Sequence, residues 1–151
     1  MKLSALIDES RVVLGLSGSA AKDDIIKHLT SVALAGNSVP SQPLIDDLCK
    51  REKLMSTGIG QGVAIPHTHT PAIAKPYSAL GISTDGIAWD AVDGEPVHIV
   101  FLLITPDSQP LLHVQTLGEM AALFGSEDTR REVISSRSPK ELIDAIRRSE
   151  K

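Results

Sequence analysis

Hydrophobic residues recur at helical spacing in the first part of the chain and again in its last third. Apolar residues three or four positions apart indicate one buried face of a helix, and glycine or proline marks where such a helix stops. Two helices are predicted in the first part: one follows an N-cap at Ser19 and stops at Gly36, and the other covers 41–53. Three are predicted in the last third. The first has Val114, Leu117, Ala121 and Phe124 on a single stripe and ends before Gly125, the second covers 127–135, and the third covers 139–149 with Ser138 as its N-cap.

The middle of the chain carries the patterns of strands. Short runs of β-branched and other apolar residues bounded by turn residues are typical of strands, and they occur here at 11–16, 63–65, 77–83 and 97–104. The turn signal at Asp85-Gly86 predicts that residues 87–89 pair back on the preceding strand as a hairpin, which a second turn at Asp93-Gly94 closes. Because 97–104 is almost wholly apolar, we expect it to be a central strand covered on both faces.

The order of these elements predicts the fold class. Helices, then a block of strands, then helices again imply an α/β three-layer sandwich, with helices on both faces of a mixed sheet. The predicted hairpin argues against a purely parallel sheet. At 151 residues, without repeats, linkers or low-complexity tracts, the chain fits one domain over 1–151.

Composition excludes several classes of function. A net charge of -4 and an aromatic content of 3% provide neither the basic surface nor the stacking platforms of a nucleic-acid-binding protein. The longest strongly apolar run is too short to span a bilayer, and the amino terminus lacks the pattern of a signal peptide. The single cysteine, Cys49, excludes an internal disulfide. We therefore expect a cytoplasmic protein without a membrane-inserted segment.

The stretch from Ser56 to His69, STGIGQGVAIPHTH, is the strongest candidate for chemistry. Its glycines recur at every second position, which permits positive φ angles and a close approach by a ligand or partner. Pro66 fixes the backbone just before His67 and removes a hydrogen-bond donor. We expect His67 to lie at the stiffened end of the strand over 63–65.

Four side chains near predicted element ends can converge with each other: His67, His69, His113 and Arg51. The glycines do not fit a nucleotide-binding loop, since they lack the strand–turn–helix context that such a loop requires. A metal site would use the three histidines as ligands. A phosphoryl carrier would use a neutral imidazole, which attacks phosphorus without an activating base, while a second imidazole, a guanidinium and a helix N-terminus stabilise the charge.

A family resemblance favours the last interpretation. The stretch STGIGQGVAIPH follows the Arg51-Glu52 pair and precedes the stretches GEPVHIVFLLITP and LLHVQTLGEMAALF. This arrangement resembles the IIA domain of the bacterial phosphoenolpyruvate-dependent sugar phosphotransferase system, of the fructose, mannitol and nitrogen-regulatory type, from Leu3 to Arg148. The resemblance implies a mixed sheet of about five strands, a cytoplasmic location, no cofactor, and a phosphoryl group accepted from the phosphocarrier HPr or its nitrogen-branch counterpart.

The resemblance also implies roles for individual residues. His67 matches the phosphorylated histidine, with Nε2 as the attacking atom, and His113 matches a second histidine that helps to hold the phosphoryl oxygens. Arg51 matches an arginine suited to neutralising the phosphoryl charge of roughly -1.5 to -2. Thr68 stands where the family typically has glycine. Its neighbour His69 can contact the phosphoryl group or face solvent, and we favour solvent.

Two functions fit this resemblance. In one, His67 relays the phosphoryl group to a IIB domain during sugar uptake. In the other, the protein belongs to the nitrogen-regulatory branch, and its phosphorylation state determines which target protein it binds. A histidine-ligated metalloenzyme is a third interpretation. Both carrier functions require an exposed, mildly apolar surface around His67 where a partner docks.

Overall fold

The computed structural model describes residues 2–150. The elements in chain order are η1 (Leu3–Ala5), η2 (Glu9–Arg11), β1 (Val12–Val13), α1 (Lys22–Ala33), α2 (Gln42–Leu54), β2 (Gly58–Gly60), β3 (Val63–Ala64), β4 (His67–Thr70), β5 (Tyr77–Ile87), β6 (Val97–Pro106), α3 (Pro110–Phe124), α4 (Glu127–Ile134) and α5 (Pro139–Ser149). Within the described residues, the strands form one six-stranded sheet in the order β1-β5-β6-β3-β2, with β4 also paired to β6.

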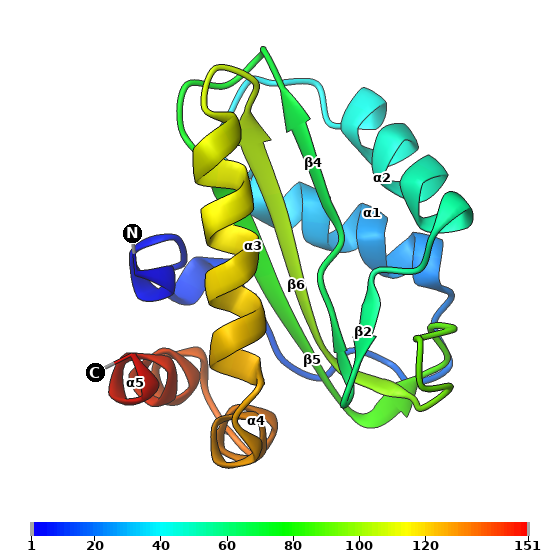
Figure 1. The fold of residues 1–151 in the computed structure, drawn as a ribbon, viewed down its shortest axis with the longest axis vertical. Helices are drawn as coiled ribbons and strands as arrows, with labels where there is room; N and C mark the ends of the chain where they lie inside the picture. Colours follow the sequence, from blue (N-terminus) through cyan, green and yellow to red (C-terminus); the bar gives the residue numbers. More distant parts are fainter. Residues whose placement is uncertain (1, 151) are drawn as a thin grey trace.

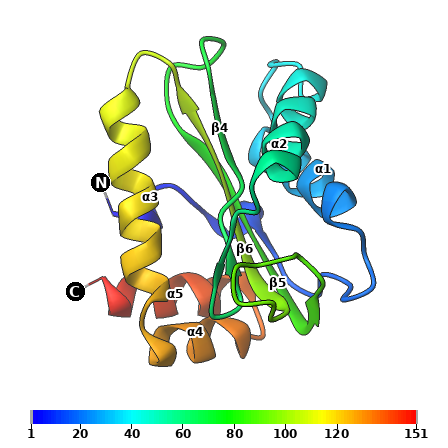
Figure 2. The same cartoon turned by 45° about the vertical axis from the view of Figure 1, so that its right-hand side comes forward.

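Helices cover both faces of this mixed sheet. Helices α1 and α2 lie on one face, and α3, α4 and α5 lie on the other (Figure 1; Figure 2). Strand β6 supplies both hydrophobic cores: Phe101 belongs to the cluster that includes Phe124 of α3, and Leu102 belongs to the cluster that includes Leu29 of α1. The prediction of a three-layer α/β sandwich with a central apolar strand is confirmed.

The strand beside β6 is interrupted by a proline. Both β3 and β4 pair with β6 in parallel and keep one register, with Val63 opposite Ile99 and His67 opposite Leu103. Pro66 has no N–H to give to the sheet, but its carbonyl still accepts a hydrogen bond from the Leu103 N–H at 3.0 Å. The two pieces therefore act as one strand, which agrees with the expected number of about five. This strand carries the chain directly to His67.

The predicted hairpin at Asp85-Gly86 is wrong. Strand β5 continues to Ile87, which pairs with Val97 of β6, and the register shifts between Ile82 and Ile87. Gly86 takes a φ of +90° inside this irregular segment. A glycine with positive φ here allows a bulge within a strand instead of a reversal. The strand that pairs back on β5 is β6, after a loop over 88–96.

The start of α1 also differs from the prediction. The helix begins at Lys22, and its N-cap residue is Ala21, which makes no side-chain capping bond. The hydroxyl of Ser19 lies 2.9 Å from the hydroxyl of Ser17 instead. Asp23 and Asp24 in the first turn of α1 stabilise the positive end of the helix dipole in place of a capping hydroxyl. By contrast, the cap predicted at Ser138 of α5 is confirmed.

The buried face of α3 is not the stripe that the spacing predicted. Thr116, Met120 and Phe124 are buried, whereas Val114 is 65% exposed. A threonine is tolerated on the buried face because its hydroxyl donates to the carbonyl of Leu112 at 2.7 Å. Of the predicted stripe, Phe124 is buried and Leu117 is partly buried against the same core, whereas Val114 and Ala121 are exposed.

Contacts within the protein explain why glycine occurs at several positions of the stretch over 58–62. Gly60 and Gly62 take φ angles of +96° and +81° in the turn between β2 and β3. A Cβ atom on Gly58 would lie only 2.7 Å from the Cβ of Ala91. The expected close approach is therefore made by the protein's own chain, and the expectation that a ligand or partner makes it is not supported at Gly58.

We predict that Gly58→Ala lowers the free energy of unfolding by about 1–3 kcal/mol, because the added methyl group overlaps Ala91 and the backbone must shift. Urea denaturation measures this change. The control is Gly118→Ala, since nothing lies within 4 Å of the Cβ position at Gly118 in α3, and a helical alanine there should leave stability unchanged or raise it by about 0.5–1 kcal/mol. A Gly58→Ala protein as stable as the unmodified one would contradict this account.

Candidate functional site

His67 begins β4 and is partly buried. Its Nδ1 atom lies 2.7 Å from the carbonyl oxygen of Ile65. A carbonyl oxygen can only accept a hydrogen bond, so Nδ1 must carry the hydrogen. In the neutral ring, Nε2 then holds the unshared electron pair. The backbone two residues earlier thus selects the tautomer that has a nucleophilic Nε2.

His113 lies opposite His67 on the first turn of α3. The two ring centroids are 5.3 Å apart, with a tilt of 57° between the ring planes. The Nδ1 atom of His113 lies 2.6 Å from the hydroxyl oxygen of Thr105, which is fully buried at the end of β6. When that hydroxyl donates to Nδ1, Nε2 of His113 carries the hydrogen and can donate to an anion. The predicted convergence of these two histidines is confirmed.

The environment of His113 keeps its ring neutral. Burial and, to a lesser extent, positive charge on His67, His69 and Arg51 together lower the pKa of His113 from 6.5 to about 4. A neutral ring at pH 7 can donate one hydrogen bond without competing with His67 for a proton.

Arg51 approaches the same site from the end of α2. Its Nε atom donates to Oδ2 of Asp47 at 2.8 Å, one helical turn earlier. The bond uses only Nε, and the terminal amino groups of Arg51 make no hydrogen bond to any residue within 2–150. Arg51 and His67 line one hollow with a volume of about 480 Å³. The structure therefore brings all three predicted residues to one place.

Thr68 has a structural role that the sequence did not reveal. It is fully buried, and its hydroxyl donates to Oδ2 of Asp47, the same oxygen that accepts from Arg51. Burial raises the pKa of Asp47, but the hydrogen bonds from Thr68 and Arg51 outweigh that effect and hold the pKa below its ordinary value. Asp47 is thus an ionised carboxylate that joins β4 to α2 and fixes the base of the Arg51 guanidinium.

Glu52 is a second carboxylate that sequence reasoning missed. It is 5% exposed, and its oxygens accept from the backbone N–H of Thr57 at 2.7 Å, the Thr57 hydroxyl at 2.6 Å and the indole N–H of Trp89 at 2.7 Å. These bonds tie the end of α2 to the start of the glycine-rich stretch. No local sequence pattern predicts that the glutamate after Arg51 is buried, because its partner Trp89 lies far along the chain.

His69 is half-exposed, as expected, but it does not simply face solvent. Its Nδ1 atom lies 2.5 Å from Oδ1 of Asp107, which follows β6. Its ring also meets the ring of His113 edge-on, with centroids 5.9 Å apart.

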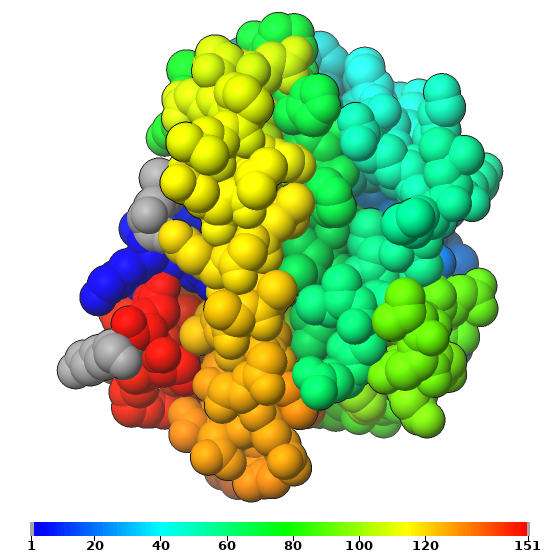
Figure 3. All heavy atoms as spheres, viewed as in Figure 1, coloured from blue at the N-terminus to red at the C-terminus, as the bar shows by residue number. Residues whose placement is uncertain are grey.

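An apolar surface surrounds the hollow beside His67. Leu54, the last residue of α2, and Met55, which follows it, are 79% and 78% exposed, and Ile59 of β2 is 47% exposed. Leu117 and Ala121, on the outer stripe of α3, also line the hollow. Figure 3 shows α3, the β2–β4 region and α2 side by side on one face of the molecule. The expected mildly apolar surface around His67 is present.

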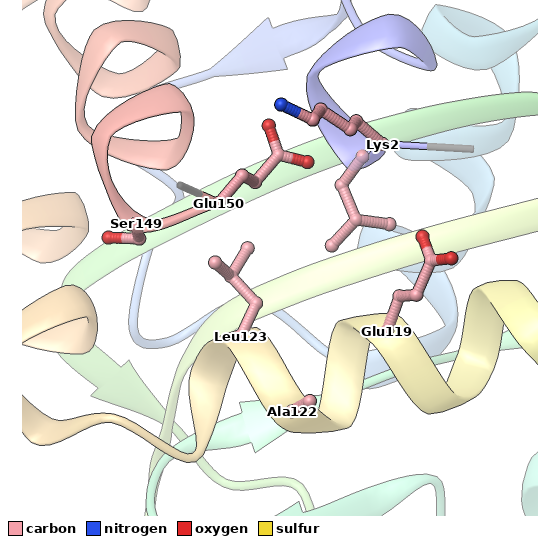
Figure 4. Close-up of a pocket in the computed structure, with 7 residues that line it drawn as sticks. Lys2, Glu119, Ala122, Leu123, Ser149 and Glu150 are labelled. Carbon is pink, nitrogen blue, oxygen red and sulfur yellow. The ribbon is translucent and has the colours of Figure 1, made fainter.

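Another hollow, of about 490 Å³, lies between the two ends of the chain. Figure 4 shows Glu119 on α3 facing Lys2 and Glu150 across it. No histidine lines this hollow, so it offers no imidazole nucleophile.

The metal-site interpretation has no geometric support. Within residues 2–150, no three histidine, cysteine, aspartate or glutamate side chains are grouped so that they could hold a metal ion. Nor does any helix of the same residues combine the length and apolar character that crossing a membrane requires.

Comparison with known families shows which family the chain belongs to. Residues 5–149 match the family described as "Phosphoenolpyruvate-dependent sugar phosphotransferase system, EIIA 2". The chain belongs to this EIIA 2 family. EIIA proteins are phosphotransferase components, so the cluster of His67, His113 and Arg51 lies in a protein class that transfers phosphoryl groups.

Relatives of this EIIA 2 chain carry both sugar-specific and regulatory names. It is 29% identical to the fructose-specific EIIABC component of Bacillus subtilis over all of the chain but only 24% of that protein, so it spans about a quarter of that relative's length. It is 28% identical to a nitrogen regulatory protein of Pseudomonas aeruginosa, over 97% of the chain and 95% of the relative. The crystal structure of nitrogen regulatory protein IIA-Ntr from Neisseria meningitidis superimposes with a TM-score of 0.88 at 26% identity, over 95% and 98% of the two chains.

We predict that His113 of the EIIA 2 chain titrates near pH 4. Its folded-state pKa lies below the ordinary value of 6.5, so the unfolded chain binds this proton more readily, and folding stability contributed by the neutral ring is lost as pH falls from about 6.5 towards 4. NMR titration of the ring C–H signals measures the midpoint. Replacing His113 by glutamine should make stability less sensitive to pH in that window. A midpoint near 6.5 would contradict the described burial of the ring.

Proposed function

We propose that this protein is a phosphoryl carrier that accepts a phosphoryl group on Nε2 of His67 from an HPr-type phosphocarrier and passes it to a IIB domain, in the cytoplasm. The bond between Nδ1 of His67 and the Ile65 carbonyl is the observation that carries this proposal. It leaves Nε2 as the one ring nitrogen with an available electron pair. Membership in the EIIA 2 family supports the same reaction.

The transfer step balances without a separate base. The electron pair on Nε2 of His67 attacks phosphorus, and the nitrogen–phosphorus bond of the donor breaks, with its electrons returning to the donor ring. The donor ring, protonated on its other nitrogen, leaves as neutral imidazole. His67 keeps the hydrogen on Nδ1 and becomes a phosphorylated imidazolium, which the Ile65 carbonyl stabilises as a hydrogen-bond acceptor.

Three groups can stabilise the transferred charge. The uncommitted amino groups of Arg51 lie beside the hollow that His67 lines. The neutral ring of His113 can donate from Nε2. His113 also sits at the start of α3, where the helix dipole has its positive end. Phosphoryl transfer depends chiefly on such positioning and charge stabilisation.

The apolar surface around the hollow supports a protein as the partner. A small molecule would need a more enclosed site, whereas Leu54 and Met55 project into solvent beside the nucleophile. Exposed apolar groups of this kind around a reactive residue indicate an interaction site for another protein. Transfer between two histidines requires two such surfaces to meet.

The nitrogen-regulatory role is a second candidate with an observation in its favour. The superposition on IIA-Ntr and the relative named nitrogen regulatory protein each cover nearly the whole of both chains. In that role His67 is phosphorylated by the same chemistry, but the phosphorylation state changes which regulatory target is bound. Incubation of the phosphorylated protein with a fructose-type IIB domain separates the two: transfer favours the relay, and a retained phosphoryl group favours regulation.

We predict that phosphoenolpyruvate, the first enzyme of the phosphotransferase system and HPr together add one acid-labile phosphoryl group to the protein. His67→Ala should abolish this modification, because the attacking Nε2 is lost. His113→Ala should still accept the group but pass it on about a hundredfold more slowly or worse, because one donor to the developing charge is gone. Intact-protein mass spectrometry and a transfer time course measure both effects.

The matched control for these substitutions is His28→Ala, which removes an exposed histidine from α1 on the other side of the sheet. It should leave acceptance and transfer unchanged. An unmodified wild-type protein, or a phosphorylated His67→Ala protein, would refute the proposed nucleophile.

We further propose that residues 1–151 form one domain that unfolds as a unit, since both hydrophobic cores include side chains of β6. Trp89, the single tryptophan, reports on the α1 and α2 side, whereas far-UV circular dichroism reports also on α3, α4 and α5. We predict that fluorescence and circular dichroism transitions coincide in urea. Two separated transitions would contradict a single domain.

A further inference from the structure

His67 and His69 project from the same face of β4. Successive side chains of a strand alternate between faces, and Thr68 between them points to Asp47 on α2. The two histidine rings point the other way, and each contacts the ring of His113 on α3, at centroid distances of 5.3 and 5.9 Å. His69 is therefore a neighbour of the proposed phosphoryl site.

Asp107 holds the ring of His69 in that position. Its carboxylate oxygen Oδ1 lies 2.5 Å from Nδ1 of His69. Its backbone N–H donates to the Thr70 carbonyl at 3.0 Å, which fixes the residue against the end of β4. Because a carboxylate only accepts, Nδ1 of His69 carries a hydrogen, and the ring's other nitrogen, Nε2, is on the edge that is not held by Asp107.

We propose that His69, oriented by Asp107, is a third imidazole of the phosphoryl site, which takes up a proton when His67 is phosphorylated and then supplies a positive charge to the phosphoryl group. The proposal rests on the proposed function of His67. A phosphoryl group adds roughly -1.5 to -2 charges to the cluster. His69 is the member best placed to respond, since its side chain is 50% exposed and exchanges protons with solvent.

The charged and titratable groups around His69 explain why it and not its neighbour takes the proton. His113 on α3 is more buried, and its ring resists protonation. Arg51 on α2 already carries its charge and is tethered to Asp47. Asp107 offers His69 a carboxylate partner, so a proton on this ring forms an ion pair instead of an isolated charge. His69 acts on the phosphoryl group, and Asp107 is a positioning residue that acts through His69.

The test follows the histidine C–H signals of the protein by NMR through a pH titration, before and after phosphorylation by HPr. We expect phosphorylation to raise the titration midpoint of His69 by about one pH unit, because the phosphoryl group adds roughly -1.5 to -2 charges to a cluster in which His69 is partly exposed. His28 on α1 is the internal reference, and its midpoint should not move.

Two variants separate this role from a structural one. In the Asp107→Asn protein, phosphorylation should move the His69 midpoint less than in the wild type, because the carboxylate that orients the ring is gone. In the His69→Gln protein, the equilibrium of phosphoryl transfer from HPr should be about two- to fivefold less favourable below pH 6.5 and lose part of its pH dependence. The matched variant His28→Gln should keep the wild-type profile.

The outcomes distinguish this inference from the proposed function. A protein that takes up no phosphoryl group overturns both. A protein that is phosphorylated on His67, but in which the His69 midpoint moves no more than that of His28, overturns the role of His69 alone. An unchanged pH profile in the His69→Gln protein does the same.

Discussion

The hydrogen bond between Nδ1 of His67 and the Ile65 carbonyl is the constraint on which the rest of the site depends. It exists because Pro66 interrupts the strand beside β6 without changing its register, so the residues on either side of the proline stay in the sheet. In a neutral ring held through Nδ1, Nε2 is the nucleophilic nitrogen. The other groups of the site can assist phosphoryl transfer only because this bond leaves Nε2 available.

The site lies where two helical layers meet across the edge of the sheet. Strand β4 has α3 on one side and α2 on the other, as Figure 1 and Figure 2 show. Side chains along β4 alternate between its two faces. His67 and His69 face His113 on α3. Thr68 points to Asp47 on α2, and Asp47 in turn fixes Arg51. One short strand thus joins an imidazole cluster to a guanidinium. The buried hydroxyls of Thr68 and Thr105 hold both in place.

The sequence was informative where a local pattern carried the signal. The central strand over 97–104, the three-layer architecture and the convergence of His67, His113 and Arg51 could all be predicted. What could not be predicted depends on residues far apart in the chain. Asp47 and Thr68 are 21 positions apart in the chain, and His69 and Asp107 are 38 positions apart. No periodic pattern in the sequence predicts that the members of either pair are in contact.

The errors also have physical causes. Helix α3 is apolar on two stripes, because Met120 and Phe124 pack on the sheet while Leu117 and Ala121 line the hollow beside His67. Spacing alone cannot tell a core face from a docking face. The turn signal at Gly86 was misread since a bulge and a reversal both require a positive φ.

The central claim remains that Nε2 of His67 is the phosphorylated atom. NMR of the phosphorylated protein labelled with ¹⁵N tests it most directly: phosphorus coupled to Nε2 of His67, with the hydrogen retained on Nδ1, is the expected result, and phosphorus on Nδ1 or on another side chain would contradict it.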